Sequence, residues 1–192
     1  IYKEYKAGRK PRVNRELGDH ETVDESRANL QTQYAKLKEY LSYLGVAQAE
    51  IEGCEADDVI GYLVTGPYHE IDKVVVSTDR DMLQLVDKHT LIYSPTKKEY
   101  YTTKRFVEQV GVCHQNFIYT KAILGDSSDN IKGVKGVGDK GLIKLFPFLA
   151  ERPSSLEEIK RHAEEHAKES QKLRSVLAEW DLIVSNLALM QL

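Results

Sequence analysis

Residues 124–146 read LGDSSDNIKGVKGVGDKGLIKLF, and the rest of the chain is organised around this stretch. Asp126 and Asp129 lie three residues apart and directly precede a glycine-rich turn. The turn, Gly136-Val137-Gly138, opens a predicted helix at Asp139, and free N–H groups at a helix N-terminus attract phosphate. Four lysines surround it: Lys132, Lys135, Lys140 and Lys144. The stretch predicts a metal site followed by a phosphate-binding turn. For the glycines alone, an ordinary helix connection capped by Asp139 is the alternative.

The bulk composition is that of one mixed-charge domain. The chain has 192 residues, of which 41% are hydrophobic, and this is enough to bury a sizeable core. A net charge of −3 argues against a uniformly basic nucleic-acid binder. The charge is segregated, however, because residues 1–15 carry six lysines and arginines against one acid, Glu4. A basic stripe beside an acidic cluster suits an enzyme that holds phosphates and metal together.

Other features narrow the cellular setting. Cys54 and Cys113 are too few for a disulfide framework and favour a reducing compartment. The sequence shows no signal peptide and no apolar run of membrane length, so we expect a cytoplasmic protein without a membrane partner. The chain begins at Ile1 without a methionine, and we expect it to be part of a longer protein.

Hydrophobic spacing predicts the first helices. Apolar residues recur at helical spacing between Asp24 and Leu44, which predicts a core-facing helix ended by Gly45. Residues 46–51 are a candidate short strand. Glu55-Ala56-Asp57-Asp58 then begins an apolar helix. Acids in a first helical turn commonly stabilise the helix dipole, but three acids in four residues exceed what capping needs.

A β-branched run marks the predicted sheet. Residues 73–78, KVVVST, are typical of a buried parallel strand, and Asp79-Arg80-Asp81 follow at its carboxyl end. Open α/β sheets bind ligands at that end of their strands. We further predict a short helix over 82–86, a strand over 91–94, a turn at 97–99 before 100–102, and helices over 103–110 and 115–124.

The C-terminal part is predicted to be helical. Ser154 and Glu157 fit a capping box for a helix over 156–170, followed by a helix over 173–186 and a candidate strand over 187–192. His162 to His166 match the H-x-x-E-H pattern of some zinc peptidases. Because this helix is polar and offers no third ligand, a solvated helix face explains the pattern better.

Seven carboxylates converge on one end of the predicted sheet: Glu55, Asp57, Asp58, Asp79, Asp81, Asp126 and Asp129. Packed together unpaired they would repel, and divalent cations remove that repulsion. Ligation by oxygen alone, without His or Cys, selects Mg²⁺ or Mn²⁺ over Zn²⁺. Two such ions about 4 Å apart can activate a water and stabilise the leaving oxygen in phosphodiester hydrolysis. These residue types and spacings predict a nuclease active site.

The ordered motifs also resemble the 5′-nuclease family, which comprises flap endonucleases, phage 5′–3′ exonucleases and the 5′-nuclease domain of bacterial DNA polymerase I. The chain looks most similar to the phage-type members. Tyr5-Lys6-Ala7-Gly8-Arg9 resembles the Y-K-x-x-R segment of the helical arch. The family patterns E-A-D-D, S-x-D-x-D and G-D-x-x-D-N-I match residues 55–58, 77–81 and 125–131. Gly133 to Lys140 resemble the helix–two-turn–helix motif that grips duplex DNA.

The resemblance implies a fold and a set of roles. The fold is an α/β core with a mainly parallel central sheet flanked by helices (PIN-like), a helix–two-turn–helix and a helical C-terminal part. Lys6 and Arg9 are implied to contact the scissile phosphate. The seven carboxylates are implied to hold two Mg²⁺ or Mn²⁺ ions. The implied DNA contacts are Tyr5, Lys132, Gly133, Lys135, Gly136, Gly138 and Lys140, and a K⁺ ion is often held at the helix–two-turn–helix.

The resemblance also implies a domain plan. Residues 1–23 belong to the arch, 24–124 to the α/β core, and 125–192 to the helix–two-turn–helix and C-terminal helices, all in one nuclease domain. Family members begin with metal-binding strands that this sequence lacks, so we expect two further ligands upstream. The implied enzyme is a monomeric 5′–3′ exonuclease or flap endonuclease of a bacterial or phage-infected cell, removing RNA primers from RNA–DNA hybrids during replication.

Two alternatives stay open. A non-catalytic branched-DNA-binding module would use only the glycine turn and the basic stripe, but seven carboxylates would then weaken its DNA binding. A PIN-like ribonuclease shares the acidic α/β site but gives no reason for the glycine turn. Dependence of cleavage on Mg²⁺, and a choice between RNA and flap DNA, separate these functions.

Overall fold

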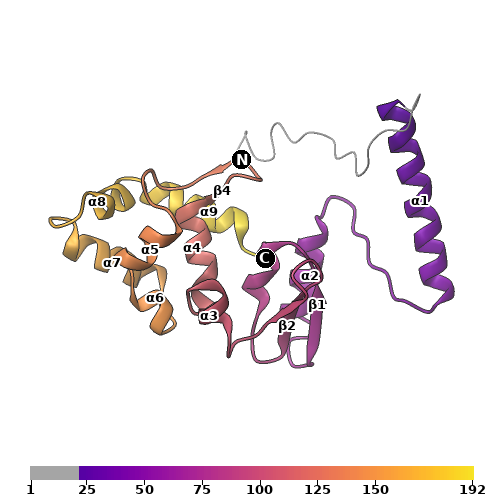
Figure 1. The fold of residues 1–192 in the computed structure, drawn as a ribbon, viewed down its shortest axis with the longest axis horizontal. Coiled ribbons are helices and arrows are strands. Elements are labelled where there is room, and N and C mark those ends of the chain that lie inside the picture. Colours follow the sequence, from indigo (N-terminus) through magenta and orange to yellow (C-terminus); the bar gives the residue numbers. More distant parts are fainter. Residues whose placement is uncertain (1–21) are drawn as a thin grey trace. The chain divides into compact units, whose positions relative to one another are not determined.

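The computed structural model describes residues 22–192 (Figure 1). These residues belong to two compact units, which comprise residues 22–54 and 55–192 of the described part. In this part of the chain, no helix is both long and apolar enough to cross a membrane.

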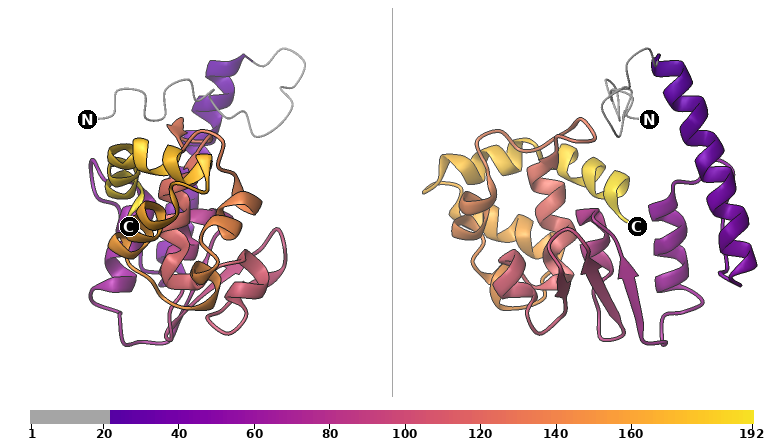
Figure 2. Two further views of the ribbon diagram at one scale, coloured as in Figure 1. Left: turned by 90° about the vertical axis from the view of Figure 1, so that its left-hand side faces the viewer. Right: turned by 45° about the vertical axis from the view of Figure 1, so that its right-hand side comes forward.

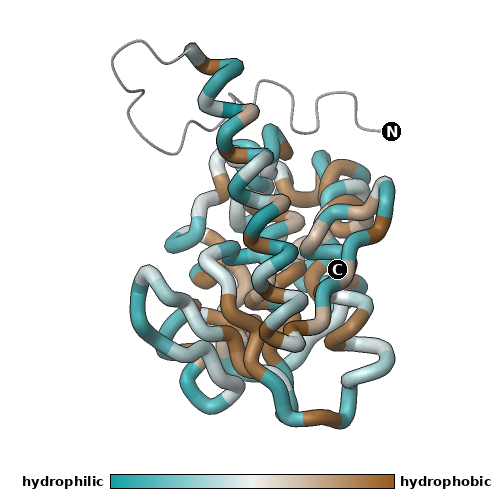
Figure 3. The backbone as a smooth tube through the Cα atoms, turned by 90° about the vertical axis from the view of Figure 1, so that its right-hand side faces the viewer, coloured by the Kyte–Doolittle hydropathy of each residue, from teal (hydrophilic) through white to brown (hydrophobic). Residues whose placement is uncertain are grey.

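The first unit consists of helix α1 (Val23–Tyr43) and the segment that follows it. Thr22 and Glu25 form a capping box, in which the Glu25 N–H donates to Thr22 Oγ1 (3.2 Å) and the Thr22 N–H donates to Glu25 Oε2 (2.9 Å). The predicted helix is confirmed, and Gly45 follows its end with φ +70°. Its prediction as core-facing is wrong, since no residue of α1 is buried. Figure 3 shows hydrophilic and hydrophobic residues alternating along it.

The strand predicted over residues 46–51 is also wrong. The segment turns back on α1, because the Val46 N–H donates to the Leu41 carbonyl (3.0 Å) and Gln48 Nε2 donates to the Lys38 carbonyl (2.9 Å). Lys38 also forms an ion pair with Glu50. A strand needs a neighbouring strand to satisfy its backbone groups, and here the Val46 N–H is bonded to α1 instead.

The second unit contains a three-stranded sheet. Strands β1 (Lys73–Val76) and β2 (Thr90–Ser94) pair in parallel, and β3 (Glu99–Tyr101) pairs antiparallel with β2. The right-hand view of Figure 2 shows the strands between helix α2 (Ala56–Thr65) and the other helices of the unit. The α/β class is confirmed, although parallel pairing in the described residues is limited to β1 and β2. Side chains alternate between the two faces of a strand, so Val74 and Val76 point to the same face of the sheet. They are 49% and 65% exposed, so this face is largely uncovered, whereas the sequence predicted full burial.

Short helices connect the sheet to the acidic stretch. A 3₁₀ helix, η1 (Arg80–Leu85), follows β1, and α3 (Phe106–Val110) follows β3 and ends at Gly111 in the left-handed conformation. A second 3₁₀ helix, η2 (His114–Asn116), leads into α4 (Phe117–Leu124). The predicted helices in this region are therefore confirmed in place, with shifted starts.

The acidic stretch forms a two-stranded hairpin and then a series of helices. The hairpin pairs β4 (Gly125–Asp126) with β5 (Ile131–Lys132). The helices are α5 (Asp139–Leu145), α6 (Phe148–Glu151), α7 (Leu156–His166), α8 (Gln171–Ala178) and α9 (Trp180–Met190).

Three predictions for this C-terminal part are corrected. The cap of α7 is Ser155, whose Oγ accepts from the Glu158 N–H (3.2 Å), so the predicted Ser154–Glu157 box is one residue early. The helix predicted over 173–186 is two helices that meet at Glu179. The strand predicted over 187–192 is wrong, because residues 187–190 continue α9. An apolar run this short does not by itself distinguish a strand from the end of a buried helix.

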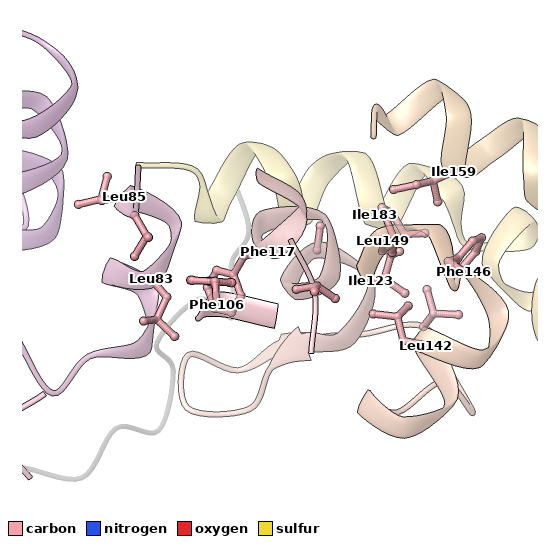
Figure 4. Close-up of a cluster of buried hydrophobic side chains, with 14 of the residues drawn as sticks. Leu83, Leu85, Phe106, Phe117, Ile123, Leu142, Phe146, Leu149, Ile159 and Ile183 are labelled. Atoms are coloured by element: carbon pink, nitrogen blue, oxygen red, sulfur yellow. The ribbon is translucent and has the colours of Figure 1, made fainter. Parts of the chain in front are cut away.

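One hydrophobic core extends from η1 to the C-terminal helices (Figure 4). Helices α4 and α9 pack along each other, and two fully buried asparagines tie the elements together. Asn186 Nδ2 donates to the carbonyls of Ala122 (2.9 Å) and Lys132 (2.8 Å), which joins α9 to α4 and to β5. Asn116 Nδ2 donates to the carbonyls of Leu149 (2.8 Å) and Arg152 (2.7 Å). These bonds fix the helices that surround the candidate site.

Candidate active site

The predicted acidic side chains meet around one pocket of the second unit. A pocket of about 180 Å³ is lined by six of the seven predicted carboxylates: Glu55, Asp57, Asp58, Asp81, Asp126 and Asp129. The seventh, Asp79, lies beside it and accepts a hydrogen bond from the Asp81 N–H (3.0 Å). Ile131, Leu189, Met190 and Leu192 complete the lining with apolar side chains.

Three separate elements deliver these acids. Asp79 caps η1 directly after β1, at the carboxyl end of that parallel strand. Glu55 and its neighbours begin α2, where the Glu55 N–H donates to Asp58 Oδ2 (3.3 Å), so Asp58 serves in part as the dipole-stabilising acid that was the alternative explanation. Asp126 stands in β4 at the end of α4.

The hairpin that carries Asp126 depends on two glycines. Gly125 has φ +73°, and a Cβ there would lie 2.5 Å from the Ile131 carbonyl oxygen. A Cβ on Gly133 would overlap the carbonyl oxygen of Leu124. The two strands thus approach too closely for any side chain, and this approach places Asp126 and Ile131 on the same pocket.

The structure adds Lys121, a residue that sequence reasoning missed. Its ammonium group forms ion pairs with Asp81 and with Asp126, the latter at 2.9 Å from Nζ to Oδ2. The Lys121 side chain is only 12% exposed. A signal was present in the sequence, because Lys121 is the single charged residue of the largely apolar helix α4 and lies five positions before Asp126.

Asp81, Asp126 and Lys121 all have shifted pKa values. Burial raises the pKa of Asp81, and the nearby negative charges of Asp79 and Asp126 add to that effect, while Lys121 opposes it. Burial also acts to raise the pKa of Asp126, but hydrogen bonds from Ser128 and Lys121 outweigh it and lower the pKa to about 2. Burial acts to lower the pKa of Lys121, and its two carboxylate partners raise it overall. Lys121 is therefore charged at neutral pH.

The donor set suits a hard divalent cation. The pocket is lined by carboxylates and apolar side chains, without lysine, arginine or histidine. Oxygen donors of this kind select Mg²⁺ or Mn²⁺. Across residues 22–192, however, no three acidic, histidine or cysteine side chains are yet grouped tightly enough to hold an ion. By the chemistry of their oxygen donors, the residues of the pocket fit a hard divalent cation.

The predicted phosphate-binding turn lies beside the acids. A neighbouring pocket of about 450 Å³ is lined by Lys121 and Asp126 and also by Gly138 and Asp139, at the start of α5. Gly136 has φ +82°, and Gly136 and Gly138 are both exposed. The predicted cations Lys132, Lys135 and Lys140 are exposed as well, while Gly133 is half-buried in the hairpin. Tyr5, Lys6 and Arg9 lie outside the described residues.

The zinc-peptidase pattern in α7 is structural. His162 Nε2 lies 2.9 Å from the Leu145 carbonyl oxygen, and its ring packs against Phe146 and Phe148 with centroid separations of 5.5 and 5.1 Å. His162 is thus partly a packing residue, where the sequence suggested a solvated face.

The fold and the site together define an α/β protein with a carboxylate pocket at the carboxyl end of its parallel strand. Residues 1–111 match the family model described as the 5′-3′ exonuclease, N-terminal resolvase-like domain. The chain belongs to this 5′-3′ exonuclease family, whose members are nucleases.

Curated relatives agree with this assignment. The chain is 40% identical over 169 residues to DNA polymerase I of Caldicellulosiruptor bescii, covering 82% of this chain and 17% of that protein. It is 35% identical over 141 residues to the 5′-3′ exonuclease of Aquifex aeolicus, covering 73% of this chain and 47% of that protein. The chain thus spans less than half the length of either relative.

Solved structures share the fold. A crystal structure of the bacteriophage T5 flap endonuclease in a pseudo-enzyme-product complex with DNA and metal ions matches with a TM-score of 0.70 and 26% identity, covering 89% of this chain and 62% of that chain. The T5 5′-exonuclease with bound zinc ions matches with a TM-score of 0.68 and 27% identity, over the same shares of the two chains. The predicted 5′-nuclease fold and family are therefore confirmed.

Proposed function

We propose that this protein is a structure-specific 5′–3′ exonuclease or flap endonuclease that hydrolyses phosphodiester bonds by two-metal catalysis. The observation that carries the proposal is the convergence of six carboxylates from three elements on one pocket. Such a cluster is electrostatically unfavourable unless cations neutralise it. The T5 relatives were crystallised with metal ions, which supports a divalent ion as the neutralising group.

In this proposal the carboxylates of the pocket, with Asp79, hold Mg²⁺ or Mn²⁺. When bound, these ions lower the pKa of a water and stabilise the leaving oxygen. The chain's own residues position the DNA. The apolar wall formed by Ile131, Leu189, Met190 and Leu192 limits the water around the acids.

The substrate side of the proposal uses the exposed cations and the glycine turn. Lys132, Lys135 and Lys140, with Gly133, Gly136 and Gly138, form a helix–two-turn–helix surface for the duplex backbone, with a K⁺ ion at its carbonyls. Because Gly138 has open space around its Cβ position, phosphate can approach the backbone there. In the proposed arch of residues 1–23, Lys6 and Arg9 contact the scissile phosphate region and Tyr5 contacts the DNA.

We further propose a biological role in primer removal during replication, which is supported by the relatives named DNA polymerase I. The proposed substrates are DNA with a 5′ end or flap and RNA–DNA primer hybrids, and the proposed enzyme is monomeric and cytoplasmic. The complex of the T5 flap endonuclease with DNA supports a DNA substrate. We propose one nuclease domain in which residues 55–124 belong to the α/β core and residues 125–192 to the duplex-binding part. Residues 24–54, expected from the sequence to lie in that core, belong to a compact unit of their own.

Cleavage and binding assays with a 5′-flap DNA substrate test the proposal. We expect incision in Mg²⁺ and none in EDTA, with an RNA strand of the same sequence cleaved more slowly. Asp126→Asn with Asp129→Asn should abolish incision and leave binding in metal-free buffer equal or tighter, because two negative charges facing a polyanion are gone. Metal-independent cleavage, or loss of binding by this variant, would contradict the proposed roles. A preference for the RNA strand would favour a ribonuclease.

A further inference from the structure

Lys121 occupies a position between the acids of two different elements. Its ammonium group is paired with Asp81 of η1 and with Asp126 of β4. The side chains of both aspartates are 20% exposed, and that of Lys121 is 12% exposed. A lysine so little exposed is costly unless its charge is compensated, and these two carboxylates compensate it.

The same pairing engages the oxygens of Asp126. Its Oδ2 accepts from Lys121, and its Oδ1 accepts from the backbone N–H (2.8 Å) and the hydroxyl (2.6 Å) of Ser128. Among the described residues, no group of three potential ligands is arranged to hold a metal ion. The cation that the structure places beside both Asp81 and Asp126 is the Lys121 ammonium group.

We propose that Lys121 is an internal counter-ion that competes with the divalent cation for Asp81 and Asp126. In the metal-free protein it holds the two carboxylates together, and it leaves them when a metal ion binds. This inference rests on the proposed function, since it requires that the acidic pocket bind a divalent ion. A positive charge at this position opposes a second cation, so the metal affinity of the site is lower than its carboxylates alone would give.

The neighbouring pocket gives the released side chain a place to go. Lys121 lines the pocket of about 450 Å³ and not the acidic pocket, so its ammonium group reaches the aspartates from the side of the larger space. Asp139 also lines this space and offers an alternative carboxylate partner. Lys121 can thus withdraw from Asp81 and Asp126 without unfolding α4.

The first test is the affinity for Mn²⁺ of the 192-residue chain, measured by the electron paramagnetic resonance signal of free Mn²⁺. Lys121→Met keeps the length of the side chain and removes its charge, so Mn²⁺ should bind about tenfold or more tightly than in the unchanged protein. Lys168→Met, which removes an exposed lysine outside both pockets, should leave the affinity unchanged. Equal or weaker binding by Lys121→Met would overturn the proposal, because weaker binding is what a lysine that only orders the acids for the metal predicts.

A second test uses the unchanged protein and does not depend on a variant that folds. Acetic anhydride labels lysines according to their accessibility and pairing, and mass spectrometry reads each site. Acetylation of Lys121 should be slow without metal and several-fold faster with Mg²⁺, whereas Lys168 should not respond. A Lys121 rate that Mg²⁺ leaves unchanged would refute the release.

The two proposals fail in different ways. If Asp126→Asn does not change Mn²⁺ binding by the chain, the acidic pocket is not a metal site and the proposed function fails. If binding depends on Asp126 but neither Lys121→Met nor the labelling responds, only the counter-ion proposal fails.

Discussion

At the residue scale, close backbone contacts in the hairpin at 125–133 exclude any side chain at Gly125 and Gly133. Gly133 and Gly125 face each other's strands so closely that a Cβ on either would overlap backbone atoms, which cannot rotate away as a side chain can. Gly138 is different, because a Cβ there meets nothing within 4 Å and the residue lies in ordinary extended conformation. Glycine is therefore required for backbone packing at position 133, whereas at position 138 it leaves the backbone open to a ligand.

We therefore predict that Gly133→Ala lowers the free energy of unfolding by about 3 kcal/mol or more, measured by urea denaturation. Gly138→Ala is the matched control and should change it by less than about 0.5 kcal/mol. Equal effects of the two substitutions would show that the hairpin relaxes more easily than its contacts indicate.

The depressed pKa of Asp126 predicts a pH dependence of stability. The folded-state pKa is about 2 against an ordinary value of 3.8, so its contribution is fully present above pH 3.8 and is lost as the pH falls towards 2. Because the carboxyl group is partly exposed, we expect only about 1–2 kcal/mol. In EDTA, Asp126→Asn should be less stable than the unchanged protein at pH 6, and urea titrations should show this difference shrinking below pH 3.8. A constant difference would mean that Asp126 acts through packing alone.

At the element scale, the turn before α5 is the predicted contact with duplex DNA. Gly138→Val should weaken duplex binding about tenfold, because a branched side chain blocks the approach of a phosphate to the backbone. Mn²⁺ binding and the urea midpoint should not change, since the position is open and outside the acidic pocket. Fluorescence anisotropy with a labelled duplex measures the affinity. Gly138→Ala should bind the duplex with an affinity between those of the unchanged protein and Gly138→Val. Unchanged affinity in Gly138→Val would remove this turn from the binding surface.

Helix α9 closes the acidic pocket through its C-terminal end. Gln84 of η1 donates to the Met190 carbonyl (3.0 Å) and accepts from the Leu192 N–H (3.0 Å), which holds the last residues of the chain against the acids. Gly61 of α2 approaches the same end, where its Cβ position lies 3.0 Å from that of Leu192. An element with no chemistry of its own therefore shapes the pocket.

At the scale of the whole molecule, the proposed mechanism needs two charged regions: the carboxylates of the acidic pocket and the cations near the start of the sequence. Lys6 lies outside the described residues, and the family resemblance places it at the scissile phosphate. Lys6→Ala, made in the longest natural form of the protein, should lower the cleavage rate about tenfold or more because one cation no longer offsets charge on the phosphoryl oxygens. The logarithmic salt slope of DNA binding should fall by about one unit if Lys6 also contacts phosphate in the ground state. An unchanged cleavage rate would place Lys6 away from the reacting phosphate.

The sequence by itself determined the family, the α/β class and the identity of the acidic side chains. These features depend on local spacing: the E-A-D-D and D-x-D patterns, the β-branched run 73–76 and the acids around Asp126 are each readable within a few residues. The periodicity of residues 24–44 likewise located α1, because helical spacing is a local property. This periodicity did not show whether another element covers the apolar face of α1.

Only the tertiary structure decided how distant residues combine. Burial of Val74 and Val76 depends on whether another element covers their face of the sheet. Residues 187–190 of the apolar run continue α9, which packs along α4. The pairing of Lys121 with Asp81 spans 40 positions of sequence. Such contacts are fixed by the packing of η1, α4 and the hairpin against one core, so local sequence patterns identified the acidic side chains but not the lysine that pairs with two of them.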